Sequence, residues 1–185
     1  MRKNFGAKAI LYPMPVLIIG TYDENGKANA MNAAWGGISE ETQISICIDD
    51  GHKTAKNVVK AGAFTVSIAD ADNVVACDYV GIVSGNDEPN KVAKAGFSVS
   101  KAKYVNAPII NELPLCLECR LLEIIDEDLY MAEIVNVNAD ESILDDQGSV
   151  CLEKFTPIIY DPSTHGYYKI EGRVGNAFKD GNNLR

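Results

Sequence analysis

The chain has 185 residues, enough for one domain with a buried core. Hydrophobic residues make up 46% and charged residues 23%, which is typical of a soluble globular protein. The 17 basic and 26 acidic residues give a formal net charge of −9, without a dense run of Lys or Arg, so no nucleic-acid partner is expected. No stretch approaches the roughly 20 apolar residues of a membrane span, so no membrane partner is expected either.

The N-terminus, Met1-Arg2-Lys3 followed by apolar residues 9–12, superficially resembles a secretory leader. Lys8, Pro13 and Pro15 interrupt the apolar run, which then continues into the first predicted strand. We therefore expect no leader and a cytoplasmic location.

A β-hairpin is predicted over residues 16–35. Its first arm, 16–22, is apolar and β-branched, and Asn25-Gly26 predicts a type I′ turn, in which both central residues have positive φ. The second arm, 28–35, is built from small and amide side chains and ends at the only Trp. Small side chains leave room for a flat ligand against this arm. They are equally suited to packing under a neighbouring strand.

The rest of the chain alternates between strand-like runs and short helical patterns. The predicted strands are 43–48, 63–68, 115–125, 129–138, 158–160 and 167–169, and the predicted helices are 54–61, 72–83 and 88–95. This pattern predicts a mainly β (α+β) antiparallel barrel over residues 1–171. A tail over 172–185, rich in Gly, Asn and charge, is expected to be loosely held or to dock on a partner subunit. Neither a Rossmann nor a P-loop motif is present.

The five cysteines do not predict a disulfide framework, because their number is odd and no leader is expected. Cys116 and Cys119 have the C-x-x-C spacing of redox and zinc sites. They lie in a predicted strand, however, where residues three apart point to opposite faces. We therefore predict no metal site and no dithiol site.

Two further segments carry residues suited to an anionic ligand. Lys53 and Thr54 open a predicted helix, where free N–H groups, a hydroxyl and a positive charge suit a phosphate. Ser84 and Gly85 form a loop that allows close backbone approach, and Lys91 follows on the next predicted helix. Taken singly, each segment is also typical of an ordinary capped helix or of a polar loop with a solvated lysine.

In this order and spacing, the segments resemble the flavin reductase-like, FMN-binding split-barrel family, and within it the flavoredoxins. The resemblance runs from about residue 13 to residue 178. It rests on these motifs: Pro15-Val16, Asn25-Gly26-Lys27, Asn29-Ala30-Met31, Trp35, His52-Lys53-Thr54 with Asn57, Ser84-Gly85 followed by Lys91, and Gly166-Tyr167-Tyr168. No single motif is specific, whereas their combination is.

The resemblance implies a six-stranded antiparallel Greek-key split barrel with short peripheral helices. It also implies a homodimer with FMN, rather than FAD, near the subunit interface. The implied cofactor-binding residues are Asn29, Ala30, Met31, Asn32 and Trp35 near the flavin ring, Cys47 and Ile48 beside the ribityl chain, and His52, Lys53, Thr54, Ser84, Gly85 and Lys91 around the phosphate. Tyr130 and Tyr160 stand where some relatives carry other ring-contacting or aromatic residues, and neither is counted in the site.

The leading hypothesis is therefore an FMN-dependent oxidoreductase that takes electrons from NAD(P)H or from a redox protein partner. The flavin supplies the redox chemistry, and hydride transfer to it requires no acid or base, so no side chain is predicted to be catalytic. The alternative is a non-catalytic ligand-binding module on the same barrel. A purely structural role would leave the three ligand-suited segments unexplained.

Overall fold

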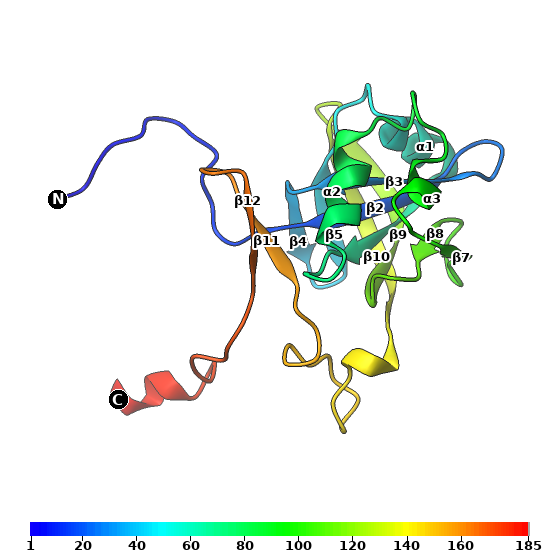
Figure 1. Cartoon of the computed structure of the whole chain (residues 1–185). Coiled ribbons are helices and arrows are strands. Elements are labelled where there is room, and N and C mark those ends of the chain that lie inside the picture. The colour runs from blue at the N-terminus through cyan, green and yellow to red at the C-terminus, as the bar shows by residue number, and fades with distance from the viewer. Residues whose placement is uncertain (185) are drawn as a thin grey trace.

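The computed structural model describes residues 1–184 as a curled seven-stranded antiparallel sheet with short helices around it (Figure 1). The predicted mainly β split-barrel fold is confirmed. The elements are β1 (Met14–Pro15), β2 (Leu17–Tyr22), β3 (Ala28–Ala33), β4 (Gly36–Glu40), β5 (Gln43–Cys47), α1 (Lys53–Ala61), β6 (Ala63–Ile68), α2 (Val74–Ile82), α3 (Lys91–Lys94), β7 (Val99–Lys101), β8 (Pro108–Ile110), β9 (Leu115–Ile125), β10 (Leu129–Ala139), η1 (Glu141–Ile143), β11 (Ile158–Asp161), β12 (Gly166–Lys169) and η2 (Asp180–Leu184).

The strand order of the main sheet is β3-β2-β6-β9-β10-β5-β4, which places β3 and β4 at its two edges. Residues 34 and 35 connect these two edges directly, so the sheet must curl on itself. The Cys47 N–H donates to the Trp35 carbonyl at 2.8 Å and holds the connection against β5. The sheet has one strand more than the expected six, because β4, which no hydrophobic pattern predicted, pairs with β5.

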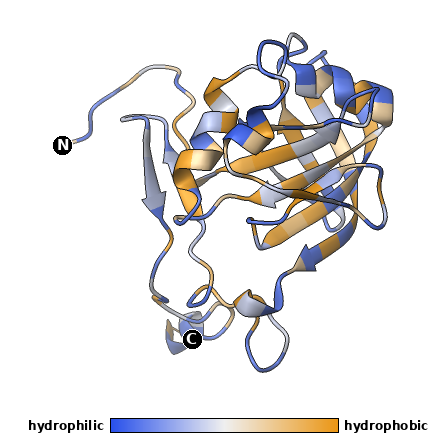
Figure 2. Ribbon diagram, turned by 45° about the vertical axis from the view of Figure 1, so that its right-hand side comes forward, coloured by the Kyte–Doolittle hydropathy of each residue, from blue (hydrophilic) through white to orange (hydrophobic). Residues whose placement is uncertain are grey.

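Two hydrophobic cores share strand β2. Leu17 and Ile19 point into the barrel, where they meet Phe64 and other apolar side chains, and Val58 of α1 packs into the same core. Val16 and Ile18 point to the other side and pack under α2 with Val80. Alternate residues of a strand face opposite sides of a sheet, so a strand buried on both faces has consecutive apolar residues, as β2 has at residues 17–19 (Figure 2).

The β2–β3 hairpin is confirmed, but its turn is not of type I′. Gly26 has φ of 76°, whereas Asn25 has no positive φ. The Gly26 N–H donates to the Asp23 carbonyl, and the Asp23 N–H donates to the Lys27 carbonyl, both at 2.9 Å. This is a three-residue loop with a single left-handed glycine. The Asp23 carboxylate selects it by accepting hydrogen bonds from two backbone N–H groups of the turn, at residues 25 and 27.

No helix within residues 1–184 is long and apolar enough to cross a membrane. All five cysteines are free thiols, as expected. Cys116 and Cys119 are both buried in β9, and burial raises the pKa of the Cys116 thiol to about 11. Residues 1–184 contain no cluster of side chains able to hold a metal ion.

Gly20 in β2 marks a close approach of β8 to the barrel. A Cβ atom here would lie 2.8 Å from the Pro108 carbonyl oxygen and 2.5 Å from Thr65 Oγ1. We expect Gly20→Ala to lower the free energy of unfolding by about 1–3 kcal/mol, because the backbone at Pro108 must move. Urea denaturation measures the effect.

Gly37→Ala is the matched control, because Gly37 also lies in a strand and a Cβ atom there would have no neighbour within 4 Å. We expect this control to change stability by less than about 0.5 kcal/mol. Equal stability of the two variants would contradict the close approach at Gly20.

Candidate functional site

The two faces of β3 have different surroundings. Asn29 and Met31 point towards α1, where both line a small pocket. Ala30 points to the core under α2, and Asn32 on the same face donates from Nδ2 to the Cys77 carbonyl at 3.3 Å. Strand alternation thus directs the side chains of Asn29 and Met31 to the pocket and those of Ala30 and Asn32 to the opposite face.

The backbone of β3 offers a second kind of contact. This strand is an edge of the main sheet and pairs only with β2. The hydrogen bond from the Asp23 N–H to the Lys27 carbonyl shows that these two residues face each other as a hydrogen-bonded pair. Because bonded and non-bonded pairs alternate along an antiparallel hairpin, the N–H and C=O groups of Ala30 and Asn32 point away from β2. Their backbone, rather than their side chains, is thus available to bond the polar edge of a ligand.

A pocket of about 110 Å³ lies where β3, the start of α1 and the loop after α2 meet. Most of the predicted site residues line it. The lining residues are Asn29, Met31, His52, Lys53, Thr54, Gly81, Ile82, Val83, Ser84, Gly85 and Lys91. Three segments far apart in the sequence, predicted separately, thus form one site.

The first turn of α1 opens onto this pocket with its N–H groups uncapped. His52 occupies the N-cap position and makes no side-chain cap hydrogen bond, and the first turn contains no acidic residue. Thr54 is buried, and its Oγ1 accepts a hydrogen bond from Asn29 Nδ2 at 2.8 Å, which links α1 to β3. Free N–H groups and the helix dipole make this end of α1 suitable for an anion.

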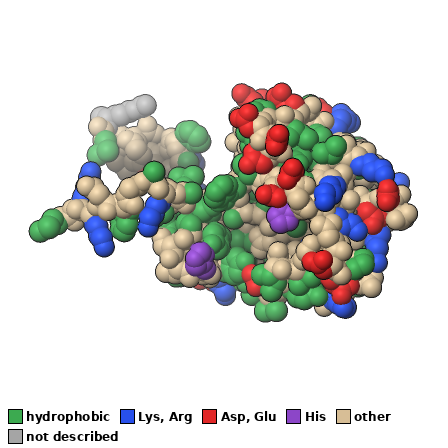
Figure 3. Space-filling model, turned by 90° about the horizontal axis from the view of Figure 1, so that it is seen from above, with side chains coloured by type: hydrophobic (Ala, Val, Ile, Leu, Met, Phe, Trp, Pro, Cys, Tyr) green, Lys and Arg blue, Asp and Glu red, His purple; other side chains and the backbone are tan. Residues whose placement is uncertain are grey.

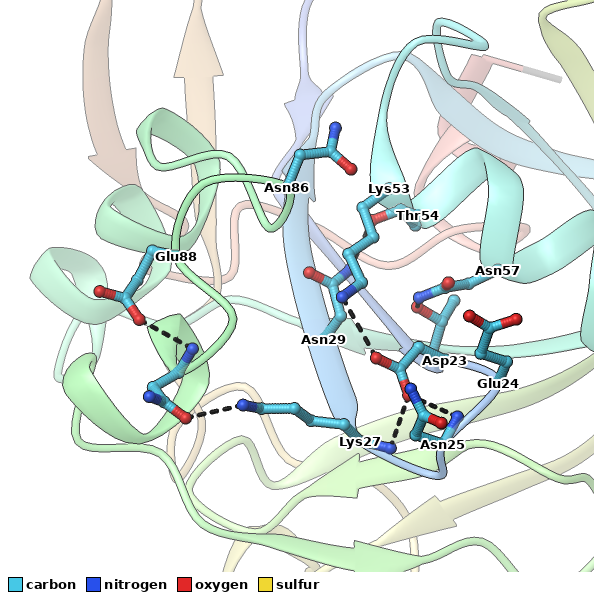
Figure 4. A network of polar contacts seen from close by, with 12 residues as sticks. Asp23, Glu24, Asn25, Lys27, Asn29, Lys53, Thr54, Asn57, Asn86 and Glu88 are labelled. Carbon is cyan, nitrogen blue, oxygen red and sulfur yellow. Dashed lines mark hydrogen bonds and ion pairs between the residues drawn. The ribbon is translucent and has the colours of Figure 1, made fainter.

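Lys53 crosses the opening of the pocket and forms an ion pair with Asp23, with Nζ 3.2 Å from Oδ2 (Figure 4). Burial alone would raise the pKa of the Asp23 carboxyl. Two backbone N–H groups of the turn, and then Lys53, lower this pKa below its ordinary value. Asp23 therefore stays ionised and holds the lysine in place.

Lys91 has no carboxylate partner among residues 1–184 and is only 4% exposed. Its Nζ donates to the carbonyls of Val80 at 2.9 Å and Val83 at 2.8 Å, at the C-terminal end of α2. Burial, and to a lesser extent Lys53, lowers the pKa of the Lys91 ammonium to about 8. An ammonium has three donors, so one remains for an anion in the pocket.

Gly85 brings its loop into contact with β3. A Cβ atom at this position would lie 2.2 Å from Asn29 Oδ1 and 3.3 Å from the Lys53 side chain. The loop after α2 therefore reaches the pocket only because residue 85 has no side chain. Ser84, next to it, caps its own loop by accepting from the Asn86 N–H at 3.1 Å.

Three predicted site residues lie elsewhere. Trp35, 58% exposed, and Cys47 line a separate apolar hollow of about 470 Å³, which the N-terminal segment closes through Leu11 and Pro13. Ile48 is 2% exposed and its side chain belongs to the barrel core, so the contact expected beside a ribityl chain, which stays a prediction, would involve its backbone. Strand alternation at β5 turns Cys47 outward and Ile48 inward.

Sequence reasoning missed the C-terminal end of α2 and the partner of Lys53. Gly81, Ile82 and Val83 line the pocket, and Asp23 pairs with Lys53 across the hairpin turn. One signal was present, since α2 has no basic residue in its last turn. The last carbonyl groups of a helix need hydrogen-bond donors, and when its last turn has no basic residue, another segment must supply them. Lys91 supplies them for α2.

Residues 9–168 match the family model described as the flavin reductase like domain. The chain belongs to this family. The flavoredoxin of Desulfovibrio vulgaris (Miyazaki F) is 34% identical, with 98% of this chain and 100% of that chain covered and a TM-score of 0.94. The flavoredoxin from Methanosarcina acetivorans is 27% identical, with 100% of both chains covered and a TM-score of 0.89.

An uncharacterized protein of Aquifex aeolicus is 25% identical over 162 residues, which cover 80% of this chain and 81% of that protein. The resemblance to flavin reductase-like proteins and flavoredoxins that the sequence motifs indicated is thus confirmed. For this flavin reductase-like protein, the family supports a flavin as the cofactor.

The burial of Lys91 predicts an unusual titration. We expect one lysine ε-carbon resonance with a pKa of about 8 in the NMR spectrum of the ligand-free protein, absent from Lys91→Gln. The unfolded chain keeps this proton up to the ordinary lysine pKa of 10.5, so the titration should add stability as the pH rises from about 8 to 10.5. If every lysine titrates near its ordinary pKa, Lys91 is not buried as described.

Proposed function

We propose that this flavin reductase-like protein binds FMN and acts as a flavoprotein oxidoreductase. The observation that carries the proposal is the convergence of Lys91, Lys53 and the uncapped N-terminus of α1 on one pocket of phosphate size. Lys91 in particular is a buried cation without a counter-charge among the described residues, and burial of an uncompensated charge is costly. A dianionic phosphate group would supply the missing charge.

The remaining residues suit the other parts of FMN. Asn29 and Met31 line the same pocket and continue along β3, whose open edge presents the backbone groups of Ala30 and Asn32. A ligand with a phosphate at one end and a flat ring with a polar edge at the other would match this order of groups. The 34% identity to a flavoredoxin over almost the whole chain supports a flavin as the ligand.

Bound FMN supplies the redox chemistry by accepting electrons from a donor and passing them on. The protein's own residues bind and orient it. Lys53, Lys91 and Thr54 hold the phosphate, and N–H groups on the open edge of β3 stabilise negative charge at the polar edge of the ring. We assign no side chain an acid or base role.

We propose NAD(P)H or a redox protein as the electron donor. Rapid bleaching of the bound flavin by NADH or NADPH would identify a reductase. Absence of bleaching, with reduction by a protein donor, would identify an electron carrier of the flavoredoxin kind. The five free thiols fit a reducing compartment, which supports a cytoplasmic location.

The visible absorption spectrum of the purified protein tests the cofactor. We expect two flavin bands and release of FMN on denaturation. A protein that stays colourless after incubation with FMN and FAD would instead support a non-catalytic ligand-binding module on the same barrel.

Removing both phosphate-binding lysines refines this prediction. Lys53→Ala with Lys91→Ala removes two charge-assisted contacts of about 1.5–3 kcal/mol each. FMN affinity should therefore fall at least about 100-fold, whereas riboflavin affinity, which involves no phosphate, should change far less. Fluorescence titration of flavin-free protein measures both. Lys101→Ala, an exposed lysine on β7, is the control. Equal losses for FMN and riboflavin would remove these lysines from the phosphate site.

We also propose that the protein forms a homodimer. The N-terminal segment, the β11–β12 hairpin and the C-terminal tail extend from one side of the barrel, and hydrophobic side chains stand out on the segments at that side (Figures 1 and 3). Val174 and Phe178 of the tail are fully exposed, and Val75 and Ile82 on the outer face of α2 are more than 70% exposed. Such apolar surface is typical of a face covered by another subunit.

Removal of the tail tests its share in this interface. We expect a chain that ends at residue 171 to dimerise more weakly than the full chain, because the apolar side chains of the tail are lost. Light scattering over a concentration series measures the dissociation. Phe178→Asp in the full chain serves as the matched variant. If the dimer mass persists unchanged in both, the tail does not hold the dimer.

A further inference from the structure

A chain of polar side chains lies behind β3, on the face opposite the phosphate pocket. β12 begins with Gly166-Tyr167-Tyr168, and the Tyr167 hydroxyl accepts a hydrogen bond from Asn32 Nδ2 at 3.4 Å. The same hydroxyl donates to Asp78 Oδ1 of α2 at 2.8 Å. Asn32, Tyr167 and Asp78 thus connect β3, β12 and α2 behind the strand whose open edge faces the proposed ligand.

We propose that Tyr167, oriented by Asp78, is a positioning residue for the bound flavin. Through the Asn32 side chain it fixes the open edge of β3, and this edge sets how strongly the protein stabilises the reduced flavin relative to the oxidised flavin. The inference rests on the proposed function, because it requires a flavin ring along β3. It gives Tyr167 no acid or base role and no direct contact with the ligand.

Asn32 is held from behind by both α2 and β12. Its Nδ2 donates to the Cys77 carbonyl of α2 at 3.3 Å as well as to the Tyr167 hydroxyl. Gly81, one turn further along α2, lies so close that a Cβ atom there would be 2.8 Å from Asn32 Cβ. Because Asn32 is one of the residues whose N–H and C=O groups point away from β2, a change in its orientation moves the groups that face the ligand.

Tyr167 lies in a hairpin that has its own anchors. β11 pairs with β12, where Tyr160 is opposite Tyr167, and β11 also pairs with β1 just before β2 begins. The Ile158 N–H donates to the Ala69 carbonyl at 3.1 Å, which ties the start of β11 to the end of β6. The rings of Tyr160 and Tyr167 lie 6.2 Å apart and pack on the core under α2. Backbone pairing and packing therefore place the Tyr167 hydroxyl independently of Asn32.

Asp78 determines the direction in which the Tyr167 hydroxyl points. A carboxylate accepts hydrogen bonds, so the Tyr167 O–H donates to Asp78 and leaves an oxygen lone pair for the Asn32 amide. Burial, and then the hydrogen bond to Asp78, raises the pKa of Tyr167 above its ordinary value of 10.0. The hydroxyl therefore stays protonated at neutral pH, and the hydrogen bonds run in one direction from Asn32 through Tyr167 to Asp78.

The orientation of the β3 edge has a larger effect on reduced flavin than on oxidised flavin. Reduction places negative charge at the polar edge of the ring, and a hydrogen bond to a charged acceptor is about twice as strong as one to a neutral acceptor. N–H groups held in the correct direction therefore favour the reduced form. Without the Tyr167 hydroxyl the Asn32 amide loses a fixed partner, so the N–H groups are held less firmly and the reduction potential falls.

The test compares Tyr167→Phe with Tyr168→Phe in the FMN-loaded protein. Tyr168 is the matched control, because it follows Tyr167 on β12, is 53% exposed and has no side-chain hydrogen bond within residues 1–184. We expect Tyr167→Phe to lower the ratio of reduced-FMN to oxidised-FMN affinity about five- to tenfold, a fall of about 20–30 mV in a two-electron potential. Tyr168→Phe should leave the potential unchanged. Equilibration with a reference dye measures it.

Two neutral replacements of Asp78 separate its hydrogen bond from its charge. Asp78→Asn and Asp78→Ala both remove the charge, but only Asn retains an oxygen that can accept from Tyr167. We expect the potential of Asp78→Ala to lie below that of Asp78→Asn by about the Tyr167→Phe shift. Tyr167→Phe should add nothing further in the Asp78→Ala background, because the two side chains act as one unit. Equal potentials for the two Asp78 variants would overturn the role of Asp78.

The flavin-free protein separates this inference from the proposed function. We expect the Asn32 side-chain amide resonance to move in NMR spectra of Tyr167→Phe and to stay in place in Tyr168→Phe. Circular dichroism confirms that each variant is folded. Failure of the unmodified protein to bind FMN would overturn the proposed function and this inference with it. FMN binding with equal potentials in Tyr167→Phe and Tyr168→Phe would overturn the positioning role alone.

Discussion

The buried ammonium of Lys91 is the constraint on which the arrangement of the site depends. Removing an ammonium from water is costly, and here only the carbonyls at the end of α2 offset that cost in the ligand-free protein. These contacts fix the end of α2 and the start of the following loop against α3. That loop contains Gly85, whose lack of a side chain lets it reach Asn29. One side chain thus stabilises the fold locally and leaves a cation in position for an anion.

The barrel supplies the other half of the site because β2 and β3 lie between two cores. Apolar side chains on both faces of β2 hold it rigidly, and β3 pairs with it as an edge strand. An edge strand with free backbone groups is ordinarily a liability for aggregation. Here it lies next to the uncapped end of α1. The edge of β3 and the first turn of α1 thus both have N–H groups without a hydrogen-bond partner, which lowers the stability of the fold. Such local losses of stability are expected at binding sites.

Basic side chains gather around the candidate site of this acidic protein. Asp23 and Glu24 neutralise Lys53 and Lys60, while Lys91 and Lys56 have no acidic partner in the described structure. Lys91 lines the pocket at the start of α1, and Lys56 lines the adjoining groove between α1 and the β2–β3 turn. The proposed phosphate site would thus be a cationic place on a protein whose net charge is −9.

Periodicity and local chemistry determined the strands at 63–68 and 115–125, the β2–β3 hairpin and the segments that form the site, because these features depend on neighbours in the sequence. They did not determine β4, since Gly36 and Gly37 carry no hydrophobic pattern, or the turn type, which the Asp23 side chain selects. The burial of Lys91 and the groove beside Lys56 were decided by tertiary structure alone. Each depends on which distant element packs against a face, and one sequence read locally does not contain that information.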